Sequence, residues 1–137
     1  SNPVTRFARK LNPSAPGPPK NRAAPAEVAQ LLSYISSRER AGHPAGTEML
    51  RVMRGAATNH RTRIPQGVPP PHRQNVANKT GTLNRVVNDS AIVQTPDRRR
   101  YVLVIFLDGV KAHGSAEAFC RQVSALCWRE LAQPAER

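Results

Sequence analysis

Seven consecutive apolar side chains near the end of the chain limit the possible folds most strongly. They form the run Tyr-Val-Leu-Val-Ile-Phe-Leu at residues 101–107. The run is rich in β-branched and aromatic residues, so it predicts a β-strand. A strand with one face in water alternates apolar and polar side chains, and this one does not. We therefore expect a sheet that other elements cover on both faces.

Two further segments predict strands that precede this one. Residues 74–82 and 90–95 complete a set of three strands within residues 73–108. Pro96 and Asp97, between the last two strands, are typical of a tight turn. Because a tight turn joins antiparallel neighbours, the predicted sheet is antiparallel.

Two helices are predicted within residues 25–57. The first begins at Pro25, a favoured first helical residue, and ends before Gly42. Its apolar residues share one helix face: they are Val28, Leu31, Leu32 and Ile35. A second helix is predicted from about Thr47. Its inward-facing residues are expected to be Met49, Leu50, Val52, Met53 and Ala56.

A closing helix is predicted over residues 115–132, with Ser115 as its N-cap. Its apolar stripe consists of Ala116, Phe119, Cys120, Val123, Cys127 and Leu131. Residues 1–24 are rich in proline and predict no regular structure, and residues 58–72 predict a loop. The order of two helices, three strands and a helix indicates an α/β fold of the α+β type. In it an antiparallel sheet is flanked by helices.

Composition narrows the possible partners. The formal charge is +12, which attracts anionic polymers in general. The basic residues are spread along the chain and aromatic residues make up only 4%. The chain therefore lacks the interleaved stacking platform of a nucleic-acid module, and its charge indicates a solvated basic surface.

The remaining reactive side chains predict structural roles. Cys120 and Cys127 lie two helical turns apart, about 10 Å along the axis, which is too far for a disulfide. Asp89 and Asp108 suggest turn and cap roles, and Trp128 suggests a packing anchor. The four histidines, His43, His60, His72 and His113, have no metal-ligand spacing and are expected on loops or the surface. No apolar run is long enough to span a membrane.

One short motif carries a family resemblance. Residues 78–83 read Asn-Lys-Thr-Gly-Thr-Leu, end a predicted strand and are followed by two more strands and a closing helix. The Lys-Thr-Gly triplet in this setting resembles the C-terminal half of class A β-lactamases and penicillin-binding serine hydrolases. The resemblance implies the serine β-lactamase and transpeptidase-like fold, with residues 1–137 as the C-terminal part of one such domain.

A second match lies upstream. Leu11, Asn12 and Pro13, with Gly17 and a helix start at Pro25, are similar to the end of the family's omega loop. Asn12 and Lys79 are 67 positions apart (79 − 12) and stand in the family's order. The resemblance assigns Asn12 to positioning the deacylating water, whereas composition alone predicts a turn residue before proline. The family's general base stands four residues before this asparagine, where the chain has Ala8.

The resemblance also assigns roles on the Lys-Thr-Gly strand. Lys79 would place positive charge near the nucleophile and the substrate carboxylate, and the hydroxyls of Thr80 and Thr82 would bind that carboxylate. Gly81 would let the substrate lie close to the strand. The backbone N–H of Thr82 would be one of two oxyanion donors, which are worth about 3 kcal/mol in comparable sites. Without the resemblance, the segment predicts an edge strand with a solvated lysine.

The chain has no Ser-x-x-Lys and no Ser-x-Asn motif, so it contains no assignable nucleophile. We expect this chain alone to be inactive. It would become a β-lactamase-type serine hydrolase when completed by an N-terminal half or a second polypeptide. The implied ligands are β-lactams or peptidoglycan stem peptides, the implied location is the cell envelope or beyond it, and no cofactor or metal is implied. Two alternatives stay open, an inactive binding module of the same fold and a basic domain for anionic polymers.

Overall fold

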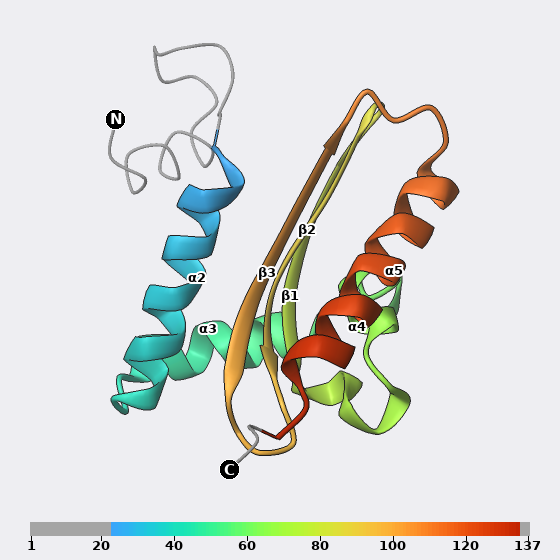
Figure 1. Ribbon diagram of the computed structural model, residues 1–137. Coiled ribbons are helices and arrows are strands. Elements are labelled where there is room, and N and C mark those ends of the chain that lie inside the picture. The colour runs from blue at the N-terminus through green and yellow to red at the C-terminus, as the bar shows by residue number, and fades with distance from the viewer. Residues whose placement is uncertain (1–22, 135–137) are drawn as a thin grey trace, which may run out of the picture.

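The computed structural model describes residues 23–134 (Figure 1). Its helices are α2 (Pro25–Arg40), α3 (Pro44–Arg54), the short α4 (Ile64–Gly67) and α5 (His113–Leu131). Its strands are β1 (Val76–Leu83), β2 (Val86–Gln94) and β3 (Arg100–Asp108). Two 3₁₀ turns, η1 (Thr58–His60) and η2 (Pro70–Asn75), lie before the sheet. The predicted α+β arrangement, an antiparallel sheet flanked by helices, is confirmed.

The sheet has the order β1-β2-β3, with both pairs antiparallel. The turn between β2 and β3 contains Asp97 and Arg98, and Arg98 has a φ of 66°. Thr95 donates its backbone N–H to the Arg99 carbonyl at 2.9 Å, which closes the hairpin. β2 begins at Val86, earlier than the predicted residue 90, because polar Asn88 and Asp89 hide the strand pattern while still pairing with both neighbours.

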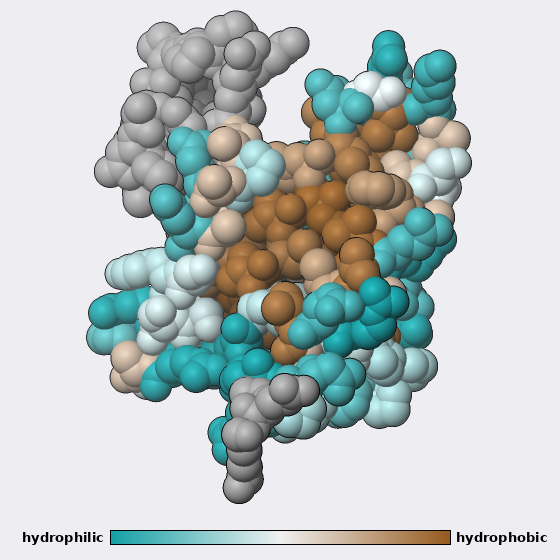
Figure 2. All heavy atoms as spheres, in the orientation of Figure 1, coloured by the Kyte–Doolittle hydropathy of each residue, from teal (hydrophilic) through white to brown (hydrophobic). Residues whose placement is uncertain are grey.

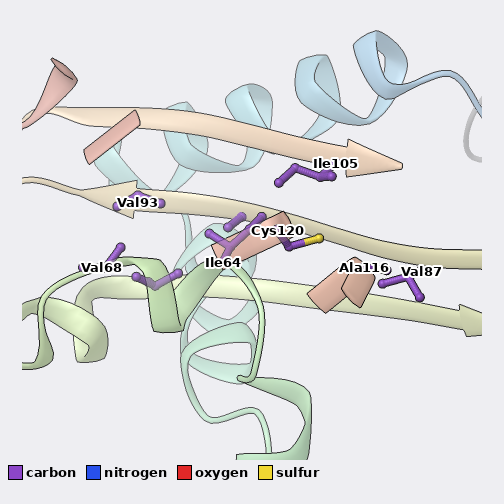
Figure 3. Packing of buried hydrophobic residues seen from close by; sticks show 9 residues of the cluster. Ile64, Val68, Val87, Val93, Ile105, Ala116 and Cys120 are labelled. Atoms are coloured by element: carbon purple, nitrogen blue, oxygen red, sulfur yellow. The ribbon is translucent and has the colours of Figure 1, made fainter. Parts of the chain in front are cut away.

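Helices cover both faces of the sheet (Figure 1). On one face, α2 and α3 bring Leu32 and Leu50 against Ala77 and Ile92. On the other face, α4 and α5 enclose a second core (Figure 3). Its buried members are Ile64, Val68, Val76, Val87, Ala91, Val93, Ile105, Ala116 and Cys120. Side chains alternate between the faces along each strand, so one strand supplies both cores.

β3 is covered on both faces, as its apolar sequence predicts, but only Ile105 within it is buried. The reason is its place at an edge of the sheet, with no strand beyond it in the described part of the chain. Figure 2 shows hydrophobic side chains gathered between α2 and α5, over this strand. Leu31 and Tyr34 of α2 and Phe119 of α5 are among the exposed apolar residues.

Several helical details differ from the predictions. Met49 and Val52 were expected inside and are 49% and 57% exposed, because α3 packs on the sheet mainly through Leu50 and Met53. Phe119 was also expected to be packed and is 50% exposed. α5 begins at His113 with Ala112 at its N-cap position, so the N-cap assigned to Ser115 is wrong. α3 begins at Pro44, not near Thr47, since proline fits a first helical turn.

Candidate functional site

The Lys-Thr-Gly segment lies on β1, the other edge of the described sheet. The hairpin with β2 closes at the pair Leu83 and Val86. In an antiparallel ladder, hydrogen-bonded pairs alternate with pairs whose backbone groups point to the outer edge. With Leu83 in a bonded pair, the N–H and C=O groups of Thr80 and Thr82 point away from β2, toward the open edge.

Two side chains donate hydrogen bonds to backbone carbonyls of that edge. Arg61 donates Nη1 to the Val76 carbonyl at 3.1 Å, and Lys79 donates Nζ to the Thr80 carbonyl. Both carbonyls belong to the outward-pointing set, which agrees with the hairpin register. The N–H of Thr82 is two residues beyond Thr80, so it points to the same edge.

The predicted site side chains divide between the two faces of β1. Ala77 faces α2 and α3, so Lys79 and Gly81 follow it on that face. Val76 faces α5, so Thr80 and Thr82 lie on the opposite face from Lys79. The structure therefore brings the two hydroxyls together on one face and holds the Lys79 side chain at the edge. Lys79 and Thr82 are exposed, and Thr80 is buried.

Both threonine hydroxyls are held by residues that precede β1. His60 Nδ1 lies 3.1 Å from Thr80 Oγ1, and Arg63 Nη2 donates to Thr82 Oγ1 at 2.7 Å. Arg63 is only 5% exposed and also donates Nη1 to the Asn88 carbonyl at 2.7 Å. No sequence motif marks Arg63, and the spacing of His60 predicts only a loop or surface residue.

The buried carboxylate of Asp89 links the segment that precedes β1 to the sheet through hydrogen bonds. Asp89 Oδ1 accepts from Asn78 Nδ2 and from the backbone N–H of Ser90, both at 3.0 Å. Asp89 Oδ2 accepts from the Ile64 N–H at 3.0 Å. Burial raises the pKa of the Asp89 carboxyl, and the hydrogen bond from Asn78 opposes that rise. The predicted turn role of Asp89 is wrong, because the side chain is fully buried within β2.

Arg61 completes the attachment of the same segment. It donates Nη1 to Asn78 Oδ1 at 3.2 Å and Nη2 to the Arg73 carbonyl at 2.6 Å. Burial lowers the pKa of this guanidinium, with the Asp89 carboxylate opposing. Arg61, Asn78 and Asp89 therefore form one polar network beneath β1. This network holds the segment that carries His60 and Arg63, the two residues that contact the Thr80 and Thr82 hydroxyls.

The other reactive residues lie outside this network. Cys120 and Cys127 are free thiols whose pKa is raised by burial, as expected for structural cysteines. Trp128 packs on the core and stacks with His72 at 5.2 Å between ring centroids. Asp108 caps the turn after β3 by accepting from the Gly109 N–H at 2.7 Å.

Two predicted positions, Asn12 and Ala8, lie outside the described residues. Within residues 23–134, no group of His, Cys, Asp and Glu side chains could hold a metal ion. No helix in that same range is both long and apolar enough to cross a bilayer.

A comparison with known protein families identifies the family of this chain. Residues 2–131 match the model of the β-lactamase enzyme family. The chain belongs to this family. No curated protein sequence matches the chain.

Solved structures support the same fold. PBP-A matches with a TM-score of 0.73 at 23% identity, over 93% of this chain and 49% of that one. The TLA-3 extended-spectrum β-lactamase matches with a TM-score of 0.72 at 20% identity, over 82% and 43%. A variant of the last common ancestor of Gram-negative class A β-lactamases matches with a TM-score of 0.74 at 20% identity, over 98% and 55%. The chain thus spans about half the length of the structures it matches.

Proposed function

We propose that this chain supplies one wall of the active site of a β-lactamase-type serine hydrolase, as the C-terminal part of a single domain. The observation that carries this proposal is the open edge of β1. Its Lys-Thr-Gly segment points the backbone N–H of Thr82 outward beside two anchored hydroxyls. An edge strand with free N–H and C=O groups binds an extended peptide-like ligand through its backbone.

Each residue of the segment has a role in acyl transfer. The Thr82 N–H donates to the oxyanion of the tetrahedral intermediate, a contribution of about 3 kcal/mol in comparable sites. Lys79 supplies positive charge at the edge, and Gly81 leaves room above the strand. The exposed Thr82 hydroxyl binds the carboxylate of a β-lactam or of a D-Ala-D-Ala-type stem peptide, and the buried Thr80 hydroxyl stays on His60 and holds the strand. A mutant of one matching structure, PBP-A, is an acyl-enzyme complex with penicillin G.

The serine nucleophile comes from outside this chain, from an N-terminal half or a second polypeptide. The surface over β3 is where this other part would attach. It combines a strand edge that no other strand of the described residues pairs with and the hydrophobic side chains gathered between α2 and α5 (Figure 2). An open hollow beside the start of β3, lined by residues that include Ser33 and Leu131, continues this surface. Family membership makes the cell envelope or its exterior the expected location.

Deacylation is proposed to be slow. Asn12 would help to position the water, but the position that corresponds to the general base holds Ala8. Without a carboxylate there, the acyl-enzyme would be long-lived, as in a penicillin-binding protein.

Intact mass spectrometry of the purified protein, denatured after incubation with excess benzylpenicillin, tests the proposal. We expect a second polypeptide to gain the mass of penicillin, and Lys79→Ala to suppress that adduct. A single species of 15.0 kDa without an adduct would remove the catalytic assignment.

A binding module of the same fold is the second candidate, and the alanine at the base position favours it. Such a module would bind penicillin reversibly at β1 and never gain its mass. A third class, a basic domain for anionic polymers, is supported only by the +12 charge. That class predicts binding that falls steeply with salt and does not depend on Lys79.

A further inference from the structure

We propose that this chain on its own forms a two-fold symmetric dimer, in which β3 pairs antiparallel with β3 of a second copy and Val104 lies on the symmetry axis. The proposal goes beyond the proposed function, because it concerns the β3 edge of this chain and not the Lys-Thr-Gly edge. It assigns one occupant to the β3 edge, a second copy of the chain, whenever the part that carries the nucleophile is not attached.

The backbone of β3 presents hydrogen-bonding groups along its outer edge. Within residues 23–134, β3 pairs with β2 on one side only. By the alternation of an antiparallel ladder, Leu103 and Ile105 bond to β2. The N–H and C=O groups of Val102, Val104 and Phe106 therefore point outward. An edge of this kind is a template for pairing with a strand of another chain.

The side chains of β3 fit a second copy of the same strand in one register. With Val104 opposite Val104 of the second copy, Val102 lies opposite Phe106, and each outward N–H meets an outward carbonyl. The same register places Arg100, the first residue of the strand, opposite Asp108, the last. Two-fold symmetry forms both of these pairs twice. No other antiparallel register of the two strands brings these opposite charges together.

The charges at the two ends of β3 are available for this pairing. Asp108 is exposed, accepts a hydrogen bond from the Gly109 N–H at 2.7 Å, and forms no ion pair within the described residues. Arg100 uses Nη1 for Glu39 and Nε for Gln94, which leaves Nη2 for a further acceptor. A guanidinium has five N–H donors, so it can bind a second carboxylate without releasing the first. Opposite charges directly across an antiparallel strand pair stabilise that pair.

The two-fold axis also matches the apolar faces of the sheet. Val102 and Val104 pack on the core beneath α2, whereas Leu103 and Leu107 pack on the core beneath α5. An axis perpendicular to the sheet places like faces side by side, so each core continues into the second copy. The hydrophobic side chains that Figure 2 shows between α2 and α5 lie over this strand. Removing such surface from water favours association.

The dimer and the completed enzyme exclude each other, because both use the β3 edge. One strand pair is a small interface, so we expect a dissociation constant of about 10–100 µM. A dilute sample of the chain therefore keeps the β3 edge open, and a concentrated sample closes it.

Sedimentation equilibrium of the full chain between about 5 and 500 µM tests the proposal. We expect the mean mass to rise with concentration from 15.0 kDa toward the mass of two chains. Val104→Pro removes the N–H that lies on the axis and should stay monomeric throughout. Proline is tolerated in an edge strand where the N–H faces solvent, so this variant keeps the fold of the monomer.

Asp108→Lys tests the register. It places a lysine opposite Arg100 in both symmetric pairs, so we expect at least about tenfold weaker dimerisation. Glu48→Lys is the matched control, because it makes the same change of net charge at an exposed position of α3. This control should leave the dissociation constant close to that of the unchanged chain.

Amide hydrogen exchange locates the interface. Between dilute and concentrated samples, we expect about tenfold more protection at Val102, Val104 and Phe106 and no change at Leu103. A mean mass of one chain at every concentration overturns the proposal, as does a dimer that Val104→Pro leaves intact. Equal effects of the two lysine variants would reject the register. All these outcomes leave the proposed function standing, because none of them depends on the Lys-Thr-Gly edge.

Discussion

Asp89 shows at the scale of one residue how the site depends on buried polar contacts. Its carboxylate accepts hydrogen bonds from Asn78, Ile64 and Ser90. Asp89→Asn replaces one acceptor oxygen with an NH₂ group that faces another donor. We expect a loss of about 1–3 kcal/mol in the free energy of unfolding, measured by urea denaturation. Asp108→Asn, at an exposed turn, is the matched control, and an equal loss in both variants would contradict this account.

The ion pair between Glu39 and Arg100 predicts a pH dependence. The hydrogen bond from Arg100, at 2.7 Å, lowers the pKa of Glu39 below its ordinary value of 4.5, against the opposing effect of burial. A lowered pKa means that stabilisation is present above the ordinary pKa and is lost as pH falls through the folded-state pKa. We expect Glu39→Gln to cost about 1 kcal/mol at pH 7 and less in acid, as the pH falls toward the lowered pKa of Glu39, by urea denaturation at both pH values.

Glu48 provides the control for that measurement. It forms an exposed ion pair with Arg51 on α3. Glu48→Gln should leave the urea midpoint unchanged at both pH values. A Glu39→Gln effect of the same size at low and neutral pH would assign its role to packing and not to charge.

At this scale the sequence identified the Lys-Thr-Gly segment, but it did not identify the residues that hold it. Apart from the bond of Asp89 to Ser90, Arg63 and Asp89 act through contacts with residues 11–54 positions away in the chain. Nothing in the local pattern marks such contacts. In the sequence, nothing distinguishes a buried arginine from the exposed basic residues around it.

At the scale of elements, the packing of α4 against α5 supports the polar network. Gly67 of α4 sits directly on α5, where an added Cβ would lie 2.5 Å from Ser124 Cβ and against the Arg121 carbonyl. Ser124 also donates to the Ile64 carbonyl at 2.7 Å. Gly67→Ala must therefore push α4 away from α5, and we expect it to cost about 1–3 kcal/mol of unfolding free energy.

Gly114 provides the control for the Gly67→Ala substitution. It lies in the first turn of α5, and an added Cβ there has no atom within 4 Å. Gly114→Ala should be neutral or slightly stabilising by thermal unfolding, since alanine favours a helix. A similar loss in both variants would mean that close packing between α4 and α5 is not what Gly67 provides.

Hydrophobic pattern was sufficient to predict the main helices, the strands and the antiparallel turn, because each has a local signature. The segment 58–72 was expected to be a loop and instead contains η1, α4 and the start of η2, which continues to Asn75. Its prolines and arginines hide these short turns, whose stability comes from contacts with β1 and α5. The inward face of α3 was also misassigned, because a short helix with many apolar residues does not show which of them meets the sheet.

At the scale of the whole molecule, the two edges of the sheet differ in chemistry. The β1 edge carries Lys79 and Thr82, and charged side chains donate hydrogen bonds to its backbone carbonyls. The β3 edge is flanked by the hydrophobic side chains that Figure 2 shows between α2 and α5. The first suits a polar ligand and the second suits another strand with apolar neighbours. The strand order that creates these edges has no local signature in the sequence.

Amide hydrogen exchange along β3 of this chain alone tests the central structural claim, that the sheet is open at this edge. By the ladder alternation, the amides of Leu103 and Ile105 bond to β2, whereas those of Val102, Val104 and Phe106 point outward. We predict that the outward set exchanges at least about tenfold faster than the bonded set. Equal protection of both sets would show that another element already covers β3, and it would contradict the proposal that the rest of the enzyme attaches there.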